Sequence, residues 1–209
     1  LQAALDAGLV PVPVYLHAPD EEAPWEPGAA SKAWLAKSLA TLSNNLASRG
    51  SRLIVRRCDS SLDALLQLQV ETGAEAVFWN RLYEPALIAR DSEIKSALRG
   101  QGVRADSFGA ALLREPWEVE TGQGEPYRVF TPFWKKLSAE LGSVSVSDAP
   151  KRLPSVPDGI EGLDVSRGDP LELVPSPRWD KGFWERFEPG EAGADKQLKA
   201  FLDSAVSGY

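Results

Sequence analysis

Short apolar runs alternate with longer amphipathic stretches over the first half of the chain. Four of these runs have the length and the β-branched or aromatic content of strands, at residues 10–16, 52–57, 76–79 and 103–108. In the stretches between them, leucine and isoleucine recur every three or four residues, which is the spacing of one helix face. Because strands and helices alternate, the pattern predicts an α/β fold, a Rossmann-like parallel sheet with helices on both faces.

Residues with special backbone or capping properties mark the ends of the predicted helices. Ser31 is the predicted cap of a helix that stops at Gly50, and a second helix is expected over residues 60–73. Pro85 suits the first position of a third helix, because the N–H that proline lacks would have no partner there. Residues 1–7 read as the end of a further helix.

The character of the chain changes after residue 108. A stripe of aromatic and aliphatic residues lines one face of a predicted helix over 130–141, and we interpret it as packing rather than as a base-stacking platform. A stretch rich in Pro, Ser, Gly and Asp follows, interrupted by aromatic residues at 179–187 that are expected to dock on a neighbouring surface. The predicted organisation is an α/β domain over residues 1–141, an interdomain connector over 142–189 and the start of a second, helical domain over 190–209.

Composition and charge exclude several classes of site. The formal net charge is -7, so this part of the chain lacks the basic face that a main nucleic-acid footprint needs. Cys58 is the only cysteine, which excludes an internal disulfide and suits a reducing intracellular compartment such as the cytoplasm, nucleus or plastid. His17 is the only histidine and would be the only candidate base for a Ser/His arrangement. No metal site is expected, and no apolar run reaches membrane-spanning length.

One glycine motif is a decoy. Gly100, Gly102 and Ala105 fit the G-x-G-x-x-A pattern of dinucleotide-binding proteins. That motif must follow a strand and open a helix, whereas these residues follow a predicted helix and precede a predicted strand. The pattern therefore indicates a turn.

Polar residues follow the third predicted strand. Asn80, Arg81, Tyr83 and Glu84 separate that strand from the helix that opens at Pro85. In an open α/β sheet, ligands bind outside the carboxyl ends of the strands, so a ligand or a second domain would touch the sheet here. Taken on their chemistry alone, these residues favour a simpler role, in which Asn80 caps the turn and the charged side chains are solvated.

Several stretches resemble the DNA photolyase/cryptochrome family. Residues 78–91 (FWNRLYEPALIARD) are similar to a strand and helix of its antenna domain, and residues 27–35 (PGAASKAWL), 112–117 (LLREPW) and 126–134 (PYRVFTPFW) agree in the same order. The resemblance covers nearly the whole chain. It implies an N-terminal α/β domain that can hold a light-harvesting chromophore, joined by a long linker to a helical domain that binds FAD and damaged DNA.

The resemblance also implies a chemistry. In the family, light-excited reduced FAD passes an electron to a cyclobutane pyrimidine dimer, which splits and returns the electron. Residues 190–209 resemble the first helix of the FAD-binding domain, and Tyr209 falls where the family has a tyrosine that contacts the FAD phosphates. The family's first strand would precede Leu1 and most of the flavin pocket would follow Tyr209. We therefore expect residues 1–209 to be an inactive, monomeric fragment that holds no catalytic residue and leaves contact with DNA to the helical domain.

An antenna chromophore would bind among the loops that follow the strands. The candidate residues are Trp25 and Tyr83, which could stack on a ring, and Asn80 and Glu84, which could form hydrogen bonds. The alternative is that Asn80 and Glu84 satisfy local backbone groups or dock the helical domain.

The resemblance narrows the choice of chromophore. Some pterin-using members of the family have an Asn-Glu pair just inside the helix, where this chain has Ala86 and Leu87. A pterin held by that carboxylate is therefore not expected. A flavin, a deazaflavin, another pterin pose and no antenna at all stay open.

Some of these stretches also indicate whether the protein resembles the repair enzymes or the signalling proteins of the family. Residues 127–134 (YRVFTPFW) look like the photolyase version of their segment, whereas residues 18–22 (APDEE) and 115–119 (EPWEV) resemble plant-type cryptochromes and the photolyases allied to them. The balance favours a blue-light-dependent photolyase, with a cryptochrome photoreceptor as the alternative. A stand-alone nucleotide-binding α/β module is the alternative outside the family.

Overall fold

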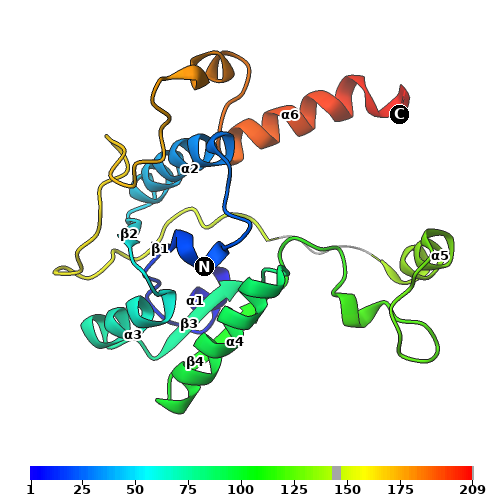
Figure 1. Cartoon of the computed structure of the whole chain (residues 1–209), viewed down its shortest axis with the longest axis horizontal. Coiled ribbons are helices and arrows are strands. Elements are labelled where there is room, and N and C mark those ends of the chain that lie inside the picture. The colour runs from blue at the N-terminus through cyan, green and yellow to red at the C-terminus, as the bar shows by residue number, and fades with distance from the viewer. Residues whose placement is uncertain (143–146, 209) are drawn as a thin grey trace. The chain divides into compact units, whose positions relative to one another are not determined.

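The computed structural model of the protein describes residues 1–142 and 147–208. The chain divides into two compact units, of which the first consists mainly of Ala3–Ala74 with Pro150–Tyr209 and the second of Glu75–Ala149. The helices and strands, labelled in Figure 1, are α1 (Gln2–Asp6), β1 (Val14–His17), α2 (Ala29–Ser48), β2 (Ile54–Arg57), α3 (Ser61–Thr72), β3 (Ala76–Asn80), α4 (Pro85–Gly100), β4 (Arg104–Phe108), α5 (Phe130–Glu140) and α6 (Glu191–Ser204). Short 3-10 helices lie at η1 (Pro19–Glu22), η2 (Pro116–Glu118), η3 (Trp179–Glu185) and η4 (Val206–Gly208).

Strands β1 and β2 of the first unit pair in parallel, with Val14 opposite Ile54 and His17 opposite Arg57. The predicted first strand began at residue 10, whereas β1 starts only after Pro13. The cause is that proline has no N–H to donate to a ladder. The carbonyl oxygen of Pro13 still accepts a hydrogen bond from the backbone N–H of Ile54 at 2.8 Å.

Helices α2 and α3 cover opposite faces of this two-stranded sheet. Successive side chains of a strand point to opposite faces. Accordingly, Val55 packs in a cluster with Leu39 of α2, and its neighbour Ile54 packs in a second cluster with Leu68 of α3. The predicted layering, with helices on both faces, is confirmed for this unit.

The segment that was predicted as a connector supplies much of the core of the first unit. Residues 147–178 contain no helix or strand, as their composition predicts, yet five of their apolar side chains are buried in the two clusters. On the α3 side these are Val156 and Ile160, and on the α2 side they are Val165, Leu171 and Leu173. The segment therefore passes from one face of the sheet to the other.

The crossing takes place at the outer edge of β2. There the backbone N–H of Leu163 donates to the carbonyl oxygen of Val55 at 2.8 Å. A Cβ added to Gly162 would stand 3.1 Å from the backbone nitrogen of Val55, so glycine permits this close approach. Backbone groups at a sheet edge need a partner, and here the connector provides one.

The domain boundaries that were predicted at residues 141 and 189 stay a prediction.

Helix boundaries in the first unit agree with the sequence except at α2. Ser60 caps α3, because its Oγ accepts a hydrogen bond from the backbone N–H of Asp63 at 3.1 Å, and the left-handed Gly73 ends that helix. The prediction that Ser31 caps α2 was wrong. The helix begins at Ala29 with Gly28 as its N-cap, so Ser31 lies within the first turn.

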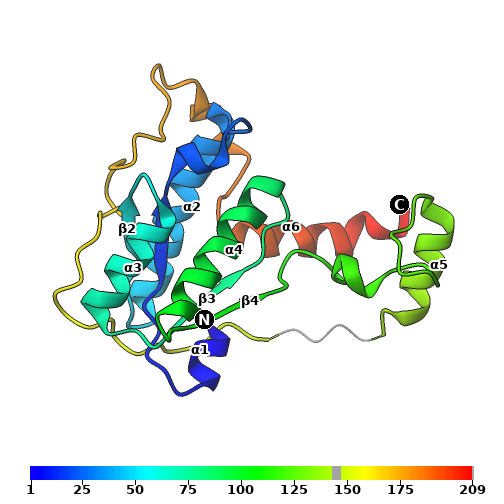
Figure 2. The same ribbon diagram turned by 60° about the horizontal axis from the view of Figure 1, so that its bottom comes forward.

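The second unit contains the parallel pair β3 and β4, with α4 packed on one face (Figure 2). Trp79 of β3 donates from Nε1 to Asp91 of α4 at 3.0 Å, and Leu98 of α4 is fully buried. Within the described residues the four strands thus form two two-stranded sheets, and both pairings are parallel as predicted. In the decoy motif Gly100 ends α4, and Gly102, at φ 78°, lies in the turn that leads to β4, which confirms that interpretation.

Helix α5 buries less of its aromatic stripe than predicted. Leu137 is buried, but Phe130 and Trp134 are 71% and 49% exposed and stack on one another with 9° between their ring planes. The prediction that the whole stripe is core was therefore wrong for these two residues.

Of the aromatic residues that were predicted to dock on a neighbouring surface, Trp184 and Phe187 contact α2, whereas Trp179 and Phe183 are 47% and 40% exposed. Trp184 and Phe187 pack against Trp34, with ring centroids 6.1 and 6.4 Å away. Helix α6 begins beside α2 in both views (Figures 1 and 2). Most of its apolar side chains, including Leu198 and Leu202, are exposed.

Candidate functional site

The carboxyl ends of β3 and β4 lie side by side in the second unit. Asn80 is the last residue of β3 and pairs with Phe108, the last residue of β4, and the backbone N–H of Arg81 donates to the carbonyl oxygen of Phe108 at 2.9 Å. The side chain of Asn80 is exposed and has no hydrogen bond within the part of the chain that the structure describes. Its predicted role as a turn cap is therefore not seen, and its amide is available to a ligand.

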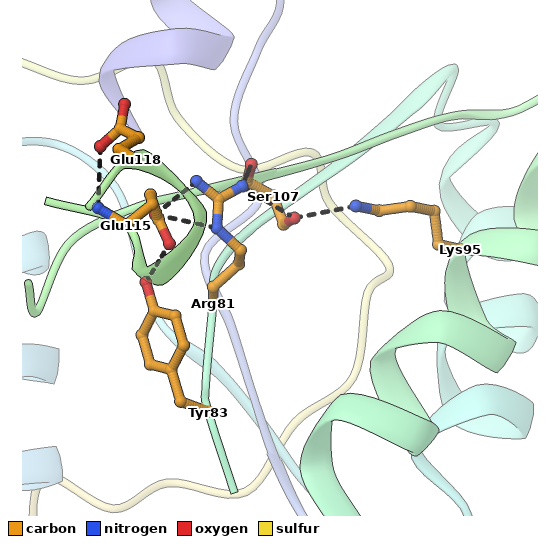
Figure 3. Close-up of polar contacts among 6 residues, drawn as sticks. All are labelled: Arg81, Tyr83, Lys95, Ser107, Glu115 and Glu118. Atoms are coloured by element: carbon orange, nitrogen blue, oxygen red, sulfur yellow. Dashed lines mark hydrogen bonds and ion pairs between the residues drawn. The ribbon is translucent and has the colours of Figure 1, made fainter. Parts of the chain in front are cut away.

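The side chain of Arg81 joins the ends of both strands to the segment that follows β4 (Figure 3). Its Nε and Nη2 atoms donate to Oε1 of Glu115 at 3.1 and 2.7 Å, and its Nη1 donates to the carbonyl oxygen of Ser107 at 2.6 Å. The two charged side chains are 29% and 12% exposed, so water screens the pair only in part. Arg81 is therefore an anchoring residue rather than a solvated charge.

Tyr83 meets the same carboxylate from the loop that precedes α4. Its hydroxyl donates to Oε2 of Glu115 at 2.9 Å (Figure 3). Partial burial and this hydrogen bond raise the pKa of Tyr83, while the hydrogen bond from Arg81 is the main cause that lowers the pKa of Glu115. At neutral pH the cluster holds one fixed cation, one fixed anion and one neutral phenol. It can bind and orient a ligand, but it is not built to exchange protons.

Lys95 of α4 extends the cluster across the sheet. Its Nζ donates to Oγ of Ser107 at 2.8 Å and lies 5.4 Å from the ring centroid of Trp79. Ser107 thus accepts a hydrogen bond from Lys95 at its hydroxyl and another from Arg81 at its carbonyl oxygen. The helix and both strands are fixed relative to one another at the end where a ligand would bind.

Glu115 also fixes the position of an exposed tryptophan. Its carboxylate and that of Glu118 form a capping box around the short helix η2, with the backbone N–H of Glu115 donating to Glu118 at 2.8 Å. Trp117 lies in this turn, 57% exposed, and the guanidinium carbon of Arg81 stands 5.5 Å from its ring centroid. The ring of Trp117 is therefore exposed on one side and contacts Arg81, close to the ends of the strands.

Three members of this cluster were not predicted from the sequence. Glu115, Ser107 and Lys95 lie 34, 26 and 14 positions from Arg81 along the chain. Glu115 stood inside a stretch that resembles the family, which was the only available signal for it. Pairings at such separations follow from the sheet register, and a local pattern does not reveal them.

The other predicted antenna residues lie as follows. Glu84 is the N-cap of α4, and one of its oxygens accepts a hydrogen bond from the backbone N–H of Tyr83 at 3.1 Å. Trp25 belongs to the first unit, where its side chain is 88% exposed. Its loop is anchored by Glu21, whose carboxylate accepts hydrogen bonds from the backbone and hydroxyl of Ser61. Tyr209 lies outside the described residues.

His17 is the last residue of β1 and Cys58 directly follows β2, and the contact between them is a backbone one. The backbone N–H of Cys58 donates to the carbonyl oxygen of His17 at 3.0 Å, which is a ladder contact. Burial and the nearby Arg57 lower the pKa of His17. Burial raises the pKa of Cys58, which disfavours its reactive thiolate form. No set of three or more His, Cys, Asp or Glu side chains suited to a metal occurs among residues 1–142 and 147–208.

A shallow cavity of about 590 Å³ lies elsewhere in the first unit. It is lined by β2, α3 and the connector, with Arg56 and Glu71 paired on its wall. None of the predicted antenna residues lines it. In the part of the chain that the structure describes, no helix is long and apolar enough to cross a membrane.

The chain is similar to known proteins over its whole length. The family model described as DNA photolyase matches residues 1–156. The chain is 39% identical to a deoxyribodipyrimidine photo-lyase of Agrobacterium fabrum and 37% identical to cryptochrome-1 of Arabidopsis thaliana, in each case over its whole length. It covers 42% of the first relative and 30% of the second.

A solved structure shows the same likeness. The chain matches the crystal structure of a bacterial class III photolyase from Agrobacterium tumefaciens with a TM-score of 0.84 and 37% identity. The match covers 97% of this chain and 41% of that one.

Proposed function

This chain belongs to the DNA photolyase family, and we propose that it is the antenna part of a blue-light-dependent photolyase that repairs cyclobutane pyrimidine dimers. The observation that carries the proposal is the match over the whole chain, at 39% identity, to a deoxyribodipyrimidine photo-lyase. The fold match to a class III photolyase supports it. The chain spans about two fifths of the length of these relatives, so the activity belongs to the whole protein.

The proposed division of labour assigns the redox chemistry elsewhere. FAD, when bound, would supply the electron that splits the dimer. Tyr209 is the one contact to the FAD phosphates that we propose in this chain. Damaged DNA would also bind outside this part, in keeping with its net charge of -7.

The described residues fit a light-harvesting role. Asn80 offers a side-chain amide at the strand ends, and Trp25 offers an exposed ring in the loop after β1. The Tyr83 hydroxyl donates to Glu115, and one Glu84 oxygen accepts a hydrogen bond from the backbone. We therefore propose that these two residues mainly hold the loop in shape, and that direct contact with a ligand is their secondary role. The chromophore would be a pterin, deazaflavin or flavin.

A cryptochrome photoreceptor is the second candidate. It is favoured by the 37% identity to cryptochrome-1 of Arabidopsis thaliana over the whole chain. Light excitation would then drive signalling, and dimers would stay intact.

A repair assay separates the two candidates. The full-length protein is purified with its flavin, reduced, and mixed with an oligonucleotide that carries one cyclobutane thymine dimer, under blue light and in the dark. We expect restored thymines in the light only. A protein whose flavin responds to light while the dimer stays intact would support the cryptochrome and refute the photolyase.

A further inference from the structure

The turn at η3 carries a carboxylate that is almost completely buried. The side chain of Asp180 is 1% exposed. Its Oδ1 accepts from Nε of Arg178 at 2.7 Å, and its Oδ2 accepts from Nη2 of Arg178 at 2.9 Å and from Nε1 of Trp184 at 2.8 Å. A buried carboxylate is tolerated only when its oxygens are occupied in this way. The carboxylate therefore fixes Trp184 relative to the start of the turn.

Trp184 in turn fastens the turn to α2. Its ring centroid lies 6.1 Å from that of Trp34, and Nζ of Lys37 lies 5.9 Å from it. Phe187 packs edge-on against the same Trp34 at 6.4 Å. The aromatic turn is thus docked on a helix whose opposite side packs on the sheet through Leu39.

A second fastening follows immediately along the chain. Gly190 has φ 101°, and a Cβ added there would stand 2.7 Å from Cγ2 of Thr41. Helix α6 begins at the next residue, Glu191. Trp34 and Thr41 are seven positions apart and share one face of α2, since seven residues complete two helical turns. The chain is held at both points just before α6 starts.

We propose that Asp180 is a positioning residue, which locks residues 178–190 onto α2 and so sets the place and direction of α6 relative to the β1–β2 sheet. The functional consequence rests on the proposed function, in which α6 leads into the flavin-binding part. A fixed α6 would then set the direction in which the chain enters that part.

The test measures the position of α6 directly. Spin labels are placed at Ser48→Cys on α2 and Asp203→Cys on α6, in a Cys58→Ser background of the full-length protein, and the distance distribution between them is recorded. We expect one narrow population, which is lost on Asp180→Ala. Trp184→Phe keeps a ring but removes the N–H donor, and should broaden the distribution without unfolding the protein. Asp195→Ala, which removes an exposed ion pair within α6, is the matched control and should leave it narrow.

The outcomes separate this proposal from the proposed function. A distribution that stays narrow in both Asp180→Ala and Trp184→Phe would overturn the positioning role, whatever the protein does in light. This measurement needs no pigment, so the absence of repair or of an antenna would leave it intact.

Discussion

The hydroxyl of Tyr83 donates a 2.9 Å hydrogen bond to Glu115, a residue that lies 32 positions further along the chain. The bond links the loop after β3 to the turn after β4. Arg81 donates to the other oxygen of the same carboxylate, so one acidic side chain organises the whole strand end. Two exposed groups lie nearby, the Asn80 side chain at the end of β3 and the Trp117 ring beside Arg81.

The first prediction concerns the ionisation of Tyr83. In the wild type its pKa is raised by partial burial and by the Glu115 hydrogen bond, against an opposing effect of Arg81. Glu115→Gln removes an anion that favours the neutral phenol and leaves the arginine, so the pKa should fall. Carbon-13 NMR of the tyrosine ζ carbons over a pH series measures it. Tyr15, whose pKa burial raises to about 12, is the internal control. An unchanged Tyr83 titration would show that the pair is not formed in solution.

The second prediction concerns the connector core. Leu171 is 3% exposed and packs with Leu39 and Val55, so Leu171→Ala should cost about 2–5 kcal/mol of unfolding free energy, as for any buried leucine. Leu163→Ala in the same segment is the control, because that side chain is 37% exposed and its change should cost far less. Chemical denaturation of both variants measures the difference. Equal and small losses would mean that the connector does not belong to the core.

The third prediction concerns acid stability. Hydrogen bonds from Arg178 and Trp184 lower the pKa of Asp180 from 3.8 to about 2. A carboxyl group whose pKa is depressed in the folded state stabilises the protein above its unfolded pKa, and this contribution is lost as the pH falls from about 4 to about 2. Asp180→Asn should therefore flatten the decline in melting temperature over that window. Asp195→Asn, at an exposed site, should leave the decline unchanged. Identical pH profiles for Asp180→Asn and wild type would contradict the depressed pKa.

The fourth prediction concerns the antenna residues. Trp25→Ala and Tyr83→Ala should each lower the amount of second chromophore that co-purifies with the full-length protein, the first by removing a stacking face and the second by releasing the loop from Glu115. Glu84→Gln should have a smaller effect, because an amide oxygen can still accept the hydrogen bond from the backbone. Absorption spectra normalised to flavin measure retention. Wild-type retention in both alanine variants would remove these residues from the pocket.

The features that depend on local periodicity were predicted from the sequence, whereas those that depend on contacts between distant residues were not. The strands at residues 54–57, 76–80 and 104–108 and the turn at Gly102 follow from apolar runs and glycine positions, and they were found to within two residues. The burial of Leu171 depends instead on a segment that returns across β2 more than 100 residues after that strand. That segment was predicted to be a connector, because it is rich in polar residues and its few apolar residues have no regular spacing.

The same limit applies to the candidate site. Tyr83 and Asn80 were predicted because they follow a buried strand, which is a local signal. The partner of Tyr83 was not, because the β3–β4 register brings Glu115 near it and no spacing within the chain encodes that register. The exposure of Phe130 and Trp134 could not be predicted from the sequence either. Their spacing predicts an apolar helix face but does not say which part of the protein covers that face.

The action spectrum of dimer repair tests the central claim most directly. The full-length protein, with reduced flavin and any co-purified chromophore, is illuminated at a series of wavelengths, and repaired thymine dimers per absorbed photon are counted. We predict repair that follows the flavin absorption and rises further within the absorption band of the second chromophore. No light-dependent repair at any wavelength would contradict the account.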